Sequence, residues 1–248
     1  MNMMRKLKSM LPITREKIGM CQYFIFGNRA NFLMYNKYFR KSYSQDGEDM
    51  LLMSLYEGQQ NYKGFYVDIG AHDPIKFSNT QYFYEKGWRG INIDATPGSM
   101  RRFNELRSED INIECGVSDR EGNLLYYSFA EAALNSFDPI LSENRINNGW
   151  ALKEKIEIPV LSINDILKRY LPVNQNIDFI DIDIEGMELQ ILKKFDFSKY
   201  SPKYFLLEDL NNDLLETDTE INAFMRSKSY FPILKCKRSV IYTFQNSK

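Results

Sequence analysis

Short apolar runs alternate along the chain from Ser42 onward with segments whose apolar residues recur at helical spacing. Apolar runs of this length are typical of buried strands, and the segments between them are typical of helices that cover a sheet. Strands are predicted at 64–70, 88–95, 111–117, 123–129, within 155–161, at 176–186, at 202–209, and in a closing hairpin at 231–236 and 240–245. Helices are predicted at 79–87, 97–109, 162–171, 187–195 and 218–230. The alternation predicts an α/β fold with a mostly parallel sheet of about seven strands, helices on both faces and an antiparallel C-terminal hairpin.

Individual residues support several of these bounds. Gly87 is placed to end the first helix, and Pro97 lies near the first turn of the second. Ser162 or Asn164 is the expected N-cap of the helix that follows the strand within 155–161. The stretch 130–150 shows neither period and is expected to be a loop.

The first 41 residues are rich in Lys, Arg and aromatic side chains and show no strand pattern. They are predicted to form an N-terminal helical appendage, 1–41, to a single domain, 42–248. Two interpretations of the appendage are a packing arm through which a homo-oligomer forms, which is favoured, and an anchor at a membrane surface. No secretory signal is expected. No stretch reaches the roughly 18 apolar residues of a membrane span.

Charge and cysteine content narrow the class of protein. The chain carries 32 Lys and Arg against 33 Asp and Glu, a formal net charge of −1, which gives no reason to expect a nucleic-acid partner. The three cysteines are odd in number and widely spaced, so neither a disulfide framework nor a cysteine metal site is indicated, and a cytoplasmic location is expected. Aromatic residues make up 14% of the chain, which suits a pocket that stacks flat or sugar-like groups.

Acidic residues stand at the carboxyl ends of four predicted strands, where ligands bind in open parallel sheets. They are Asp68, Asp94, Asp183 with Glu185, and Glu208 with Asp209. Aspartate also caps helices at such positions, which is the alternative for each residue taken alone. Four strands ending in this way favour a binding site.

The turn after the first strand, Gly-Ala-His-Asp-Pro, decides between two cofactors. Gly70 permits a tight turn, and Asp94 at the end of the next strand is placed to accept the hydroxyls of a ribose. A dinucleotide site needs further glycines, but His72 and Pro74 stand at or near those places. A sulfonium cofactor has no phosphate and is favoured by acids, so S-adenosylmethionine is preferred over NAD.

Four collinear segments then carry a family resemblance: YSQDGEDMLL (43–52), FYVDIGAHDP (65–74), FSNTQYFYEKGWRGINIDATP (77–97) and IDFIDIDIEGMELQIL (177–192). Together they resemble the FkbM family of S-adenosylmethionine-dependent methyltransferases over roughly residues 42–210. The resemblance implies the class I methyltransferase fold, which is Rossmann-like, and O-methylation of a small molecule. The expected acceptor is a sugar or nucleotide-sugar used in surface polysaccharide biosynthesis. Pro74, Asp94 and Asp181 depart from the residues usual in the family.

The family pattern assigns the cofactor-binding residues. It places Asp68, Gly70 and Ala71 at the methionine half, Asp94 with Ala95 at the ribose, and Ser118 at the adenine. Gln45, Glu48 and Asn79 are expected to close over the cofactor, although Glu48 and Asn79 would equally serve as helix or turn caps.

Two catalytic residues are expected, His72 and Asp183. His72 is the only histidine of the chain and a general-base candidate, with a structural role as the alternative. Asp181 and Asp183 share one face of a strand, and such paired charges need a compensating cation. That cation is either Mg²⁺ or Mn²⁺, held by Asp181, Asp183 and Glu208, or a lysine or arginine partner. Resemblance to metal-dependent O-methyltransferases supports the metal.

The aromatic-rich stretch 127–150 is expected to form a lid over the acceptor. Arg145, Lys153 and Lys155 are candidates for meeting the phosphates of a nucleotide-sugar, with a solvated charged face as the alternative. Two other functions stay open at this point. One is a non-catalytic binding module in a glycan assembly complex, and the other is an NAD-dependent sugar reductase, which the missing glycines disfavour.

Overall fold

The computed structural model describes residues 40–59, 61–209 and 219–245. The chain divides into two compact units, Met1–Lys41 and Ser42–Lys248. The appendage expected over 1–41 lies almost wholly outside the described residues, so its helical character stays a prediction. Among the helices that the structure does describe, none is long and apolar enough to cross a membrane.

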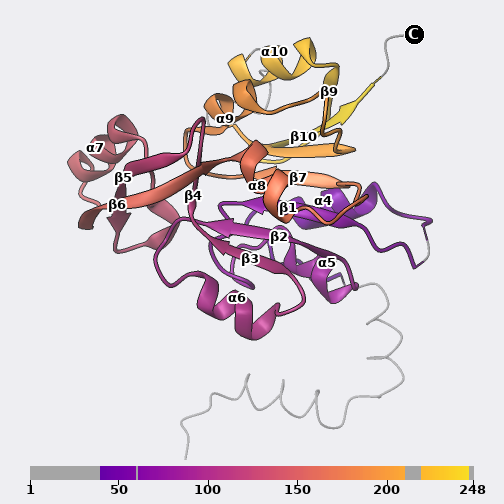
Figure 1. The fold of residues 1–248 in the computed structure, drawn as a ribbon, viewed down its shortest axis with the longest axis horizontal. Helices are drawn as coiled ribbons and strands as arrows, with labels where there is room; N and C mark the ends of the chain where they lie inside the picture. Colours follow the sequence, from indigo (N-terminus) through magenta and orange to yellow (C-terminus); the bar gives the residue numbers. More distant parts are fainter. Residues whose placement is uncertain (1–39, 60, 210–218, 246–248) are drawn as a thin grey trace, which may run out of the picture. The chain divides into compact units, whose positions relative to one another are not determined.

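A seven-stranded sheet forms the centre of the second unit (Figure 1). Its strands, in chain order, are β1 (Phe65–Ile69), β2 (Arg89–Asp94), β3 (Ile111–Glu114), β7 (Phe179–Ile182), β8 (Tyr204–Glu208), β9 (Tyr230–Lys235) and β10 (Ser239–Phe244). Their order across the sheet is β3-β2-β1-β7-β8-β10-β9. Neighbouring strands from β3 to β8 pair in parallel, whereas β10 is antiparallel to both β8 and β9. The predicted Rossmann-like sheet with its closing antiparallel hairpin is confirmed, and its switch point lies between β1 and β7.

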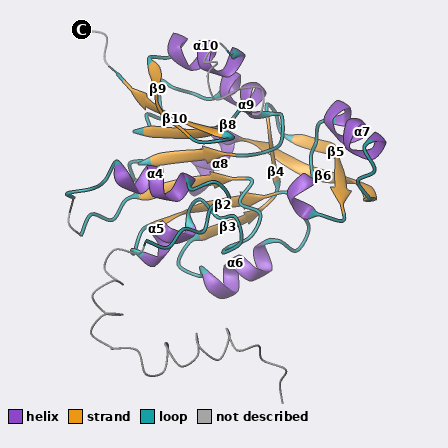
Figure 2. Cartoon of the chain, turned by 180° about the vertical axis from the view of Figure 1, so that it is seen from behind, coloured by secondary structure: helices purple, strands orange, loops and turns teal. Residues whose placement is uncertain are grey.

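Helices cover both faces of this sheet, as Figures 1 and 2 show from opposite sides. The helices are α4 (Glu48–Ser54), α5 (Gln81–Glu85) and α6 (Met100–Leu106) on one face, and α8 (Ile163–Tyr170), α9 (Glu188–Lys194) and α10 (Glu220–Ser227) on the other. The alternation of side chains along β1 explains the two layers, because successive residues point to opposite faces. Val67 packs in a cluster with residues of α8, α9 and α10, while Tyr66 packs with residues of α4 and α5.

The strand predicted at 111–117 is two strands in two sheets. After β3 the chain leaves the main sheet at Cys115, and β4 (Gly116–Ser118) joins a three-stranded sheet of order β4-β6-β5. The other members are β5 (Gly122–Phe129) and β6 (Leu152–Ser162), which pair antiparallel. The apolar run is continuous across the break, so periodicity could not reveal it. The strand predicted at 123–129 corresponds to β5, whose last four residues are buried.

The stretch 130–150, expected to be a loop, contains the short 3₁₀ helix η1 (Ala132–Leu134) and the helix α7 (Pro139–Asn147). Asp138 caps α7: its side chain accepts from the backbone N–H groups of Ile140 and Leu141, at 2.7 and 3.0 Å. Pro139 then occupies the first helical position, where its missing N–H costs nothing. These capping signals were present in the sequence, but the apolar period of the segment is too weak to predict a helix.

Other helix bounds agree with the sequence to different degrees. Gly87, with φ of 87°, follows α5 as predicted, and Ser162 rather than Asn164 is the N-cap of α8. The helix expected over 97–109 is shorter, because α6 begins at Met100 and Pro97 lies before it. The helix α4 was not predicted at all; it begins within the motif at 43–52 and ends at Ser54.

Candidate active site

A cavity of about 500 Å³ opens at the carboxyl ends of β1, β2, β7 and β8. Every residue predicted to be catalytic, cofactor-binding or metal-ligating, except Ser118, lines it: Gln45, Glu48, Asp68, Gly70, Ala71, His72, Asn79, Asp94, Ala95, Asp181, Asp183 and Glu208. These residues come from six separate stretches of the chain. The parallel strands bring them together because their carboxyl ends meet at one edge of the sheet.

Gly70 joins the turn after β1 to the loop after β7. Its φ is 89°, a conformation that side chains disfavour, and its N–H donates to the carbonyl of Ile93 at 2.9 Å. A Cβ at this position would lie 1.7 Å from the carbonyl oxygen of Asp183. The sequence predicted a tight turn at this glycine, and the structure adds a close approach between two backbone segments. The segment that approaches Gly70 so closely is the loop after β7, which leaves no room for a side chain at this position.

Asp94 is a buried carboxylate held by backbone donors from two loops. One oxygen accepts from the N–H of His72 at 3.0 Å, and the other accepts from the N–H of Thr96 at 2.8 Å. Burial raises the pKa of Asp94 above its ordinary value. These contacts fix the direction of the carboxylate at the cavity wall, next to the turn that carries His72.

His72 adopts φ of 54°, which is uncommon for a residue other than glycine. Its ring stacks with that of Phe77, with 6.4 Å between the ring centroids, and both residues line the cavity. No helix begins near Pro74, since α5 starts only at Gln81. His72 therefore stands in an extended loop at the cavity wall rather than at a helix N-terminus.

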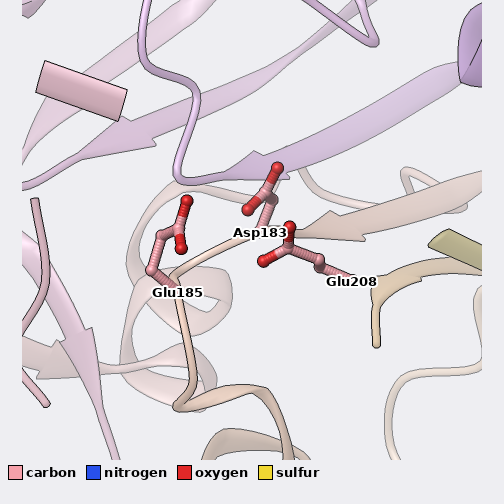
Figure 3. A group of neighbouring side chains, drawn as sticks. All are labelled: Asp183, Glu185 and Glu208. Atoms are coloured by element: carbon pink, nitrogen blue, oxygen red, sulfur yellow. The ribbon is translucent and has the colours of Figure 1, made fainter. Parts of the chain in front are cut away.

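Three carboxylates converge at the cavity floor, those of Asp183, Glu185 and Glu208 (Figure 3). An oxygen of each lies within 4.8 Å of the others. Glu208 is only 6% exposed, and among the described residues its Oε2 finds no hydrogen-bond partner. Burial, with the neighbouring carboxylates, raises the pKa of Asp183 to about 8 and that of Glu208 to about 10. The group is thus arranged as a site for positive charge.

The structure groups the predicted metal ligands differently from the sequence. Asp183 and Glu208 come together as expected, but their third neighbour is Glu185, while Asp181 lies outside this close group. Asp181 instead accepts a hydrogen bond from Nδ2 of Asn79 at 2.8 Å. Its pKa is raised well above the usual range by burial and by the neighbouring Asp68. The sequence placed Glu185 near a strand end but gave no sign that it would turn back toward Glu208.

Acidic side chains outnumber basic ones around the cavity. The acids are Glu48, Asp68, Asp94, Glu131, Asp181, Asp183, Glu185 and Glu208. Among the described residues that line the cavity, the lysines and arginines are Lys76 and Arg238. Lys76 lies 3.4 Å from Glu131, and Arg238 lies 3.6 Å from Asp46. Crowded buried carboxylates are stable only when protonated or matched by cations, so this lining fits a ligand that carries positive charge.

The motif at 43–52 forms the part of the wall nearest the β9–β10 turn. Glu48 is buried and accepts from the N–H of Asp46 at 2.9 Å, while Oγ of Ser239 approaches it at 3.5 Å. Asp49, which was not predicted as a site residue, accepts from Oγ of Ser42, N–H of Tyr43 and Oγ of Ser44 at 2.7, 2.7 and 2.8 Å. Asp49 therefore shapes the turn that carries Gln45 to the cavity.

Several candidate residues lie away from the cavity. Ser118 is buried on β4 and donates to Asp119 at 3.2 Å, while the preceding residues 115–117 reach the cavity instead. Arg145 pairs with Glu185, and neither Lys153 nor Lys155 lines the cavity. Asp209 accepts from Oγ1 of Thr219 at 2.6 Å and also lies off the cavity wall. The expected phosphate contacts of the three basic residues therefore have no counterpart in this geometry.

Comparison with known proteins gives one family match. Residues 68–232 match the model of the methyltransferase FkbM domain. A comparison with curated proteins found no match.

Two solved structures are similar at low sequence identity. The first is methyltransferase FkbM from Methylobacillus flagellatus KT, with 18% identity over 74% of this chain and a TM-score of 0.43. This chain spans only 44% of the length of that protein. The second is 1,6-didemethyltoxoflavin-N1-methyltransferase from Burkholderia thailandensis, with bound 1,6-didemethyltoxoflavin and S-adenosylhomocysteine. It is 11% identical over 95% of this chain and 92% of its own, with a TM-score of 0.42.

Proposed function

We propose that this chain transfers a methyl group from S-adenosylmethionine to a hydroxyl oxygen of a small polyhydroxylated molecule. The chain belongs to the methyltransferase FkbM domain family, and the proposal proceeds from that membership. The observation that carries the proposal is the excess of buried carboxylates at the carboxyl ends of the strands, which suits a cationic cofactor. S-adenosylmethionine supplies, when bound, a methyl group activated by a positively charged sulfonium.

The cofactor would lie along the turns after β1 and β2. Asp68, Gly70 and Ala71 would face its methionine half, with Asp68 accepting from the amino group. Asp94 and Ala95 would face the ribose, and Gln45, Glu48 and Asn79 would border it from the opposite wall. For the adenine, residues 115–117 are closer candidates than the predicted Ser118, because they line the cavity.

His72 and Asp183 are the proposed catalytic residues. Methyl transfer requires the acceptor oxygen to be aligned with the methyl carbon and the departing sulfur, so orienting the acceptor is the main task of the protein. His72 lines the cavity and would take the proton of the acceptor hydroxyl. Asp183 would orient that hydroxyl from the floor, alone or as a ligand of a metal ion.

We further propose that Mg²⁺ or Mn²⁺ binds at the floor. Asp183 and Glu208 from the predicted set would hold it, with Glu185 in the place expected for Asp181. All-oxygen ligation is what these ions prefer, and the unpartnered Oε2 of Glu208 fits such a role. A bound divalent ion would lower the pKa of a coordinated hydroxyl.

The acceptor is proposed to be a sugar or nucleotide-sugar of surface polysaccharide biosynthesis, and the acidic lining favours an uncharged sugar over one that carries phosphates. Phe77 and Trp150 line the cavity and are partly exposed, which suits stacking on a sugar ring. The free thiols of Cys115 and Cys236 support the proposal of a reducing compartment such as the cytoplasm.

The first prediction concerns cofactor binding. Calorimetry should detect S-adenosylhomocysteine binding to the wild-type chain and no binding of NADH. Asp94→Asn should weaken that binding by roughly 10- to 150-fold, the scale of a lost charge-assisted hydrogen bond of about 1.5–3 kcal/mol. Asp119→Asn, on the surface loop after β4, is the matched control and should bind like wild type. Binding of NADH but not of S-adenosylhomocysteine would overturn the proposal.

The second prediction concerns the metal and the base. Chelator-treated enzyme should lose most turnover and regain it with Mg²⁺ or Mn²⁺, and Asp183→Asn should lower turnover more than cofactor affinity. His72→Asn should lower turnover roughly 10²-fold or more, because asparagine tolerates positive φ but cannot act as the base. Full activity in excess chelator would exclude the metal, and full activity of His72→Asn would leave that residue a structural role.

A mass-spectrometric screen identifies the acceptor. Neutral sugars and nucleotide-sugars would be incubated with the enzyme and S-adenosylmethionine, and a product in which a methyl group replaces one hydrogen would be sought. Cofactor binding without methyl transfer to any member of a broad panel would favour the non-catalytic binding module.

A further inference from the structure

We propose that Arg107 is a positioning residue for the cofactor, and that it acts through the hydroxyl of Thr80 to orient Asp68 toward the amino group of S-adenosylmethionine. This inference rests on the proposed function, because it takes Asp68 to be the acceptor for that amino group. It adds two residues, from the end of α6 and from the loop before α5, that do not line the cavity.

Arg107 is a fully buried cation directly behind the cavity wall. It follows the last turn of α6 and is 0% exposed. Its Nε donates to Asp110 at 3.0 Å, and its Nη2 donates to the hydroxyl of Tyr66 at 2.6 Å and to Oδ1 of Asn92 at 2.8 Å. These bonds tie α6 to β1 and β2 and give the guanidinium one fixed orientation.

The remaining arm of the guanidinium points toward the cavity. Nη1 donates to Oγ1 of Thr80 at 3.0 Å, and Thr80 lies 2.5 Å from Oδ2 of Asp68. An arginine has no acceptor, so Thr80 must accept from it. The single hydroxyl proton of Thr80 is therefore directed at Asp68. Nε and Nη2 hold α6 in place against the sheet. The contact of Nη1 with Thr80 instead orients the hydroxyl that donates to Asp68.

The chain of contacts has two effects on Asp68. It occupies Oδ2, and among the described residues the hydrogen bonds of this carboxylate involve only that oxygen, which leaves Oδ1 for a ligand. The pKa of Asp68 is raised to about 6, mainly by burial and also by the neighbouring Asp94 and Asp110, whereas Thr80 and Arg107 act in the opposite direction. Both effects favour an ionised, fixed carboxylate at the cavity wall, which is what an ammonium group binds.

The test compares two ligands that share the adenosine and the sulfur. S-adenosylhomocysteine carries the amino-acid half, and 5′-methylthioadenosine lacks it. Thr80→Val keeps the shape of the side chain but removes the hydroxyl, and it should weaken S-adenosylhomocysteine about tenfold or more while changing 5′-methylthioadenosine by less than about twofold. Thr80→Ser, which keeps the hydroxyl, should retain the wild-type preference. Calorimetry measures both affinities.

Arg107→Lys is the second variant of the test, because lysine keeps the charge but cannot make the same set of hydrogen bonds. In the wild-type background, this variant should reduce the preference for S-adenosylhomocysteine over 5′-methylthioadenosine. In the Thr80→Val background it should reduce that preference little further, as expected for residues that act in series. If this variant does not fold, Thr80→Val decides, since the route from Arg107 to Asp68 runs through that hydroxyl. Equal weakening of both ligands, or no change of either, in Thr80→Val would overturn the inference. A wild-type chain that binds neither ligand would overturn the proposed function instead.

Discussion

At position 70 the backbone of one turn touches the backbone of another. Gly70 combines a positive φ of 89° with a missing Cβ that would stand 1.7 Å from the Asp183 carbonyl oxygen. The two sources of strain are separate, because one belongs to the residue itself and the other to its neighbour. Another glycine with the same φ but open surroundings would show the strain of the left-handed conformation alone.

Gly70→Ala should therefore cost about 2–5 kcal/mol of unfolding free energy, the sum of about 1–2 for the left-handed conformation and about 1–3 for overpacking. Gly58 has φ of 88°, and a methyl group added there would meet no heavy atom within 4 Å, so Gly58→Ala should cost only the first part. Urea denaturation of both variants measures the difference. Equal losses would show that the close approach to Asp183 carries no strain.

The residues of the site differ in how far the sequence could predict them. Asp68, Asp94 and Asp183 could be predicted because each ends or follows an apolar strand, where parallel sheets gather their ligands. Arg107 and Thr80 could not, since their contacts to Asp68 depend on the packing of α6 and of the loop before α5. Glu185 was named as a strand-end acid, but the direction of its side chain could not be predicted, because it depends on a positive φ of 58° in the loop after β7.

At the scale of elements, the segment with η1 and α7 is fastened to the loop after β7. Arg145 of α7 pairs with the carboxylate of Glu185, and it also donates to the carbonyl of Leu134 at 2.7 Å. Oγ of Ser136 donates to the carbonyl of Glu185 at 3.0 Å. The expected lid over 127–150 thus has a defined attachment point, close to the proposed catalytic floor.

Arg145→Gln should loosen this segment more than the rest of the chain. The ion pair is largely buried, and its loss leaves Glu185 facing other carboxylates, at a cost of about 1–3 kcal/mol. Hydrogen exchange of the amides in α7 should become roughly 5- to 150-fold faster, while the central strands change little. The control is Arg169→Gln at the exposed pair with Glu121, at 3.4 Å, which should leave α7 unchanged. Uniformly faster exchange across the sheet would contradict the attachment.

Helices and strands could be predicted where the spacing of apolar residues agreed with the residues that mark the ends of the element. The strands β1, β2, β7 and β8 are mostly apolar runs with an acid at or near the carboxyl end, and they lie within the predicted ranges. The break between β3 and β4 could not be predicted, because β4 pairs with β6, a strand that is distant in sequence. The order of strands across the sheet likewise depends on contacts that no local pattern carries.

For the whole molecule, the buried carboxyls link stability to pH. Asp68, Asp183 and Glu208 have pKa values raised to about 6, 8 and 10 by burial and by neighbouring carboxylates. In an unfolded chain the pKa of such a carboxyl is about 4. Between these values the folded chain holds protons that the unfolded chain has released. Stability contributed by these groups is therefore present at low pH and lost as the pH rises through their folded values.

Ligand-free, chelator-treated protein should accordingly be more stable to urea at pH 5.5 than at pH 8.5. Glu208→Gln removes one of these groups, so it should raise stability at pH 8.5 and reduce the pH slope by up to about 1.4 kcal/mol per unit. Glu105→Gln, at an exposed carboxyl of α6, should keep the wild-type slope. A slope that Glu208→Gln does not change would mean that this carboxyl is already ionised in the folded chain.

The contact at Gly70 also bears on how the gene can vary. A side chain added at Gly116 would meet side-chain atoms of Phe137 and Val160, at 2.5 and 2.7 Å, and second-site mutations that truncate both side chains can restore the space. A side chain added at Gly70 meets a carbonyl oxygen, which every residue at position 183 would present in the same place. Selection for second-site revertants should thus recover partners for damaging changes at Gly116. For Gly70 it should return only the glycine codon itself.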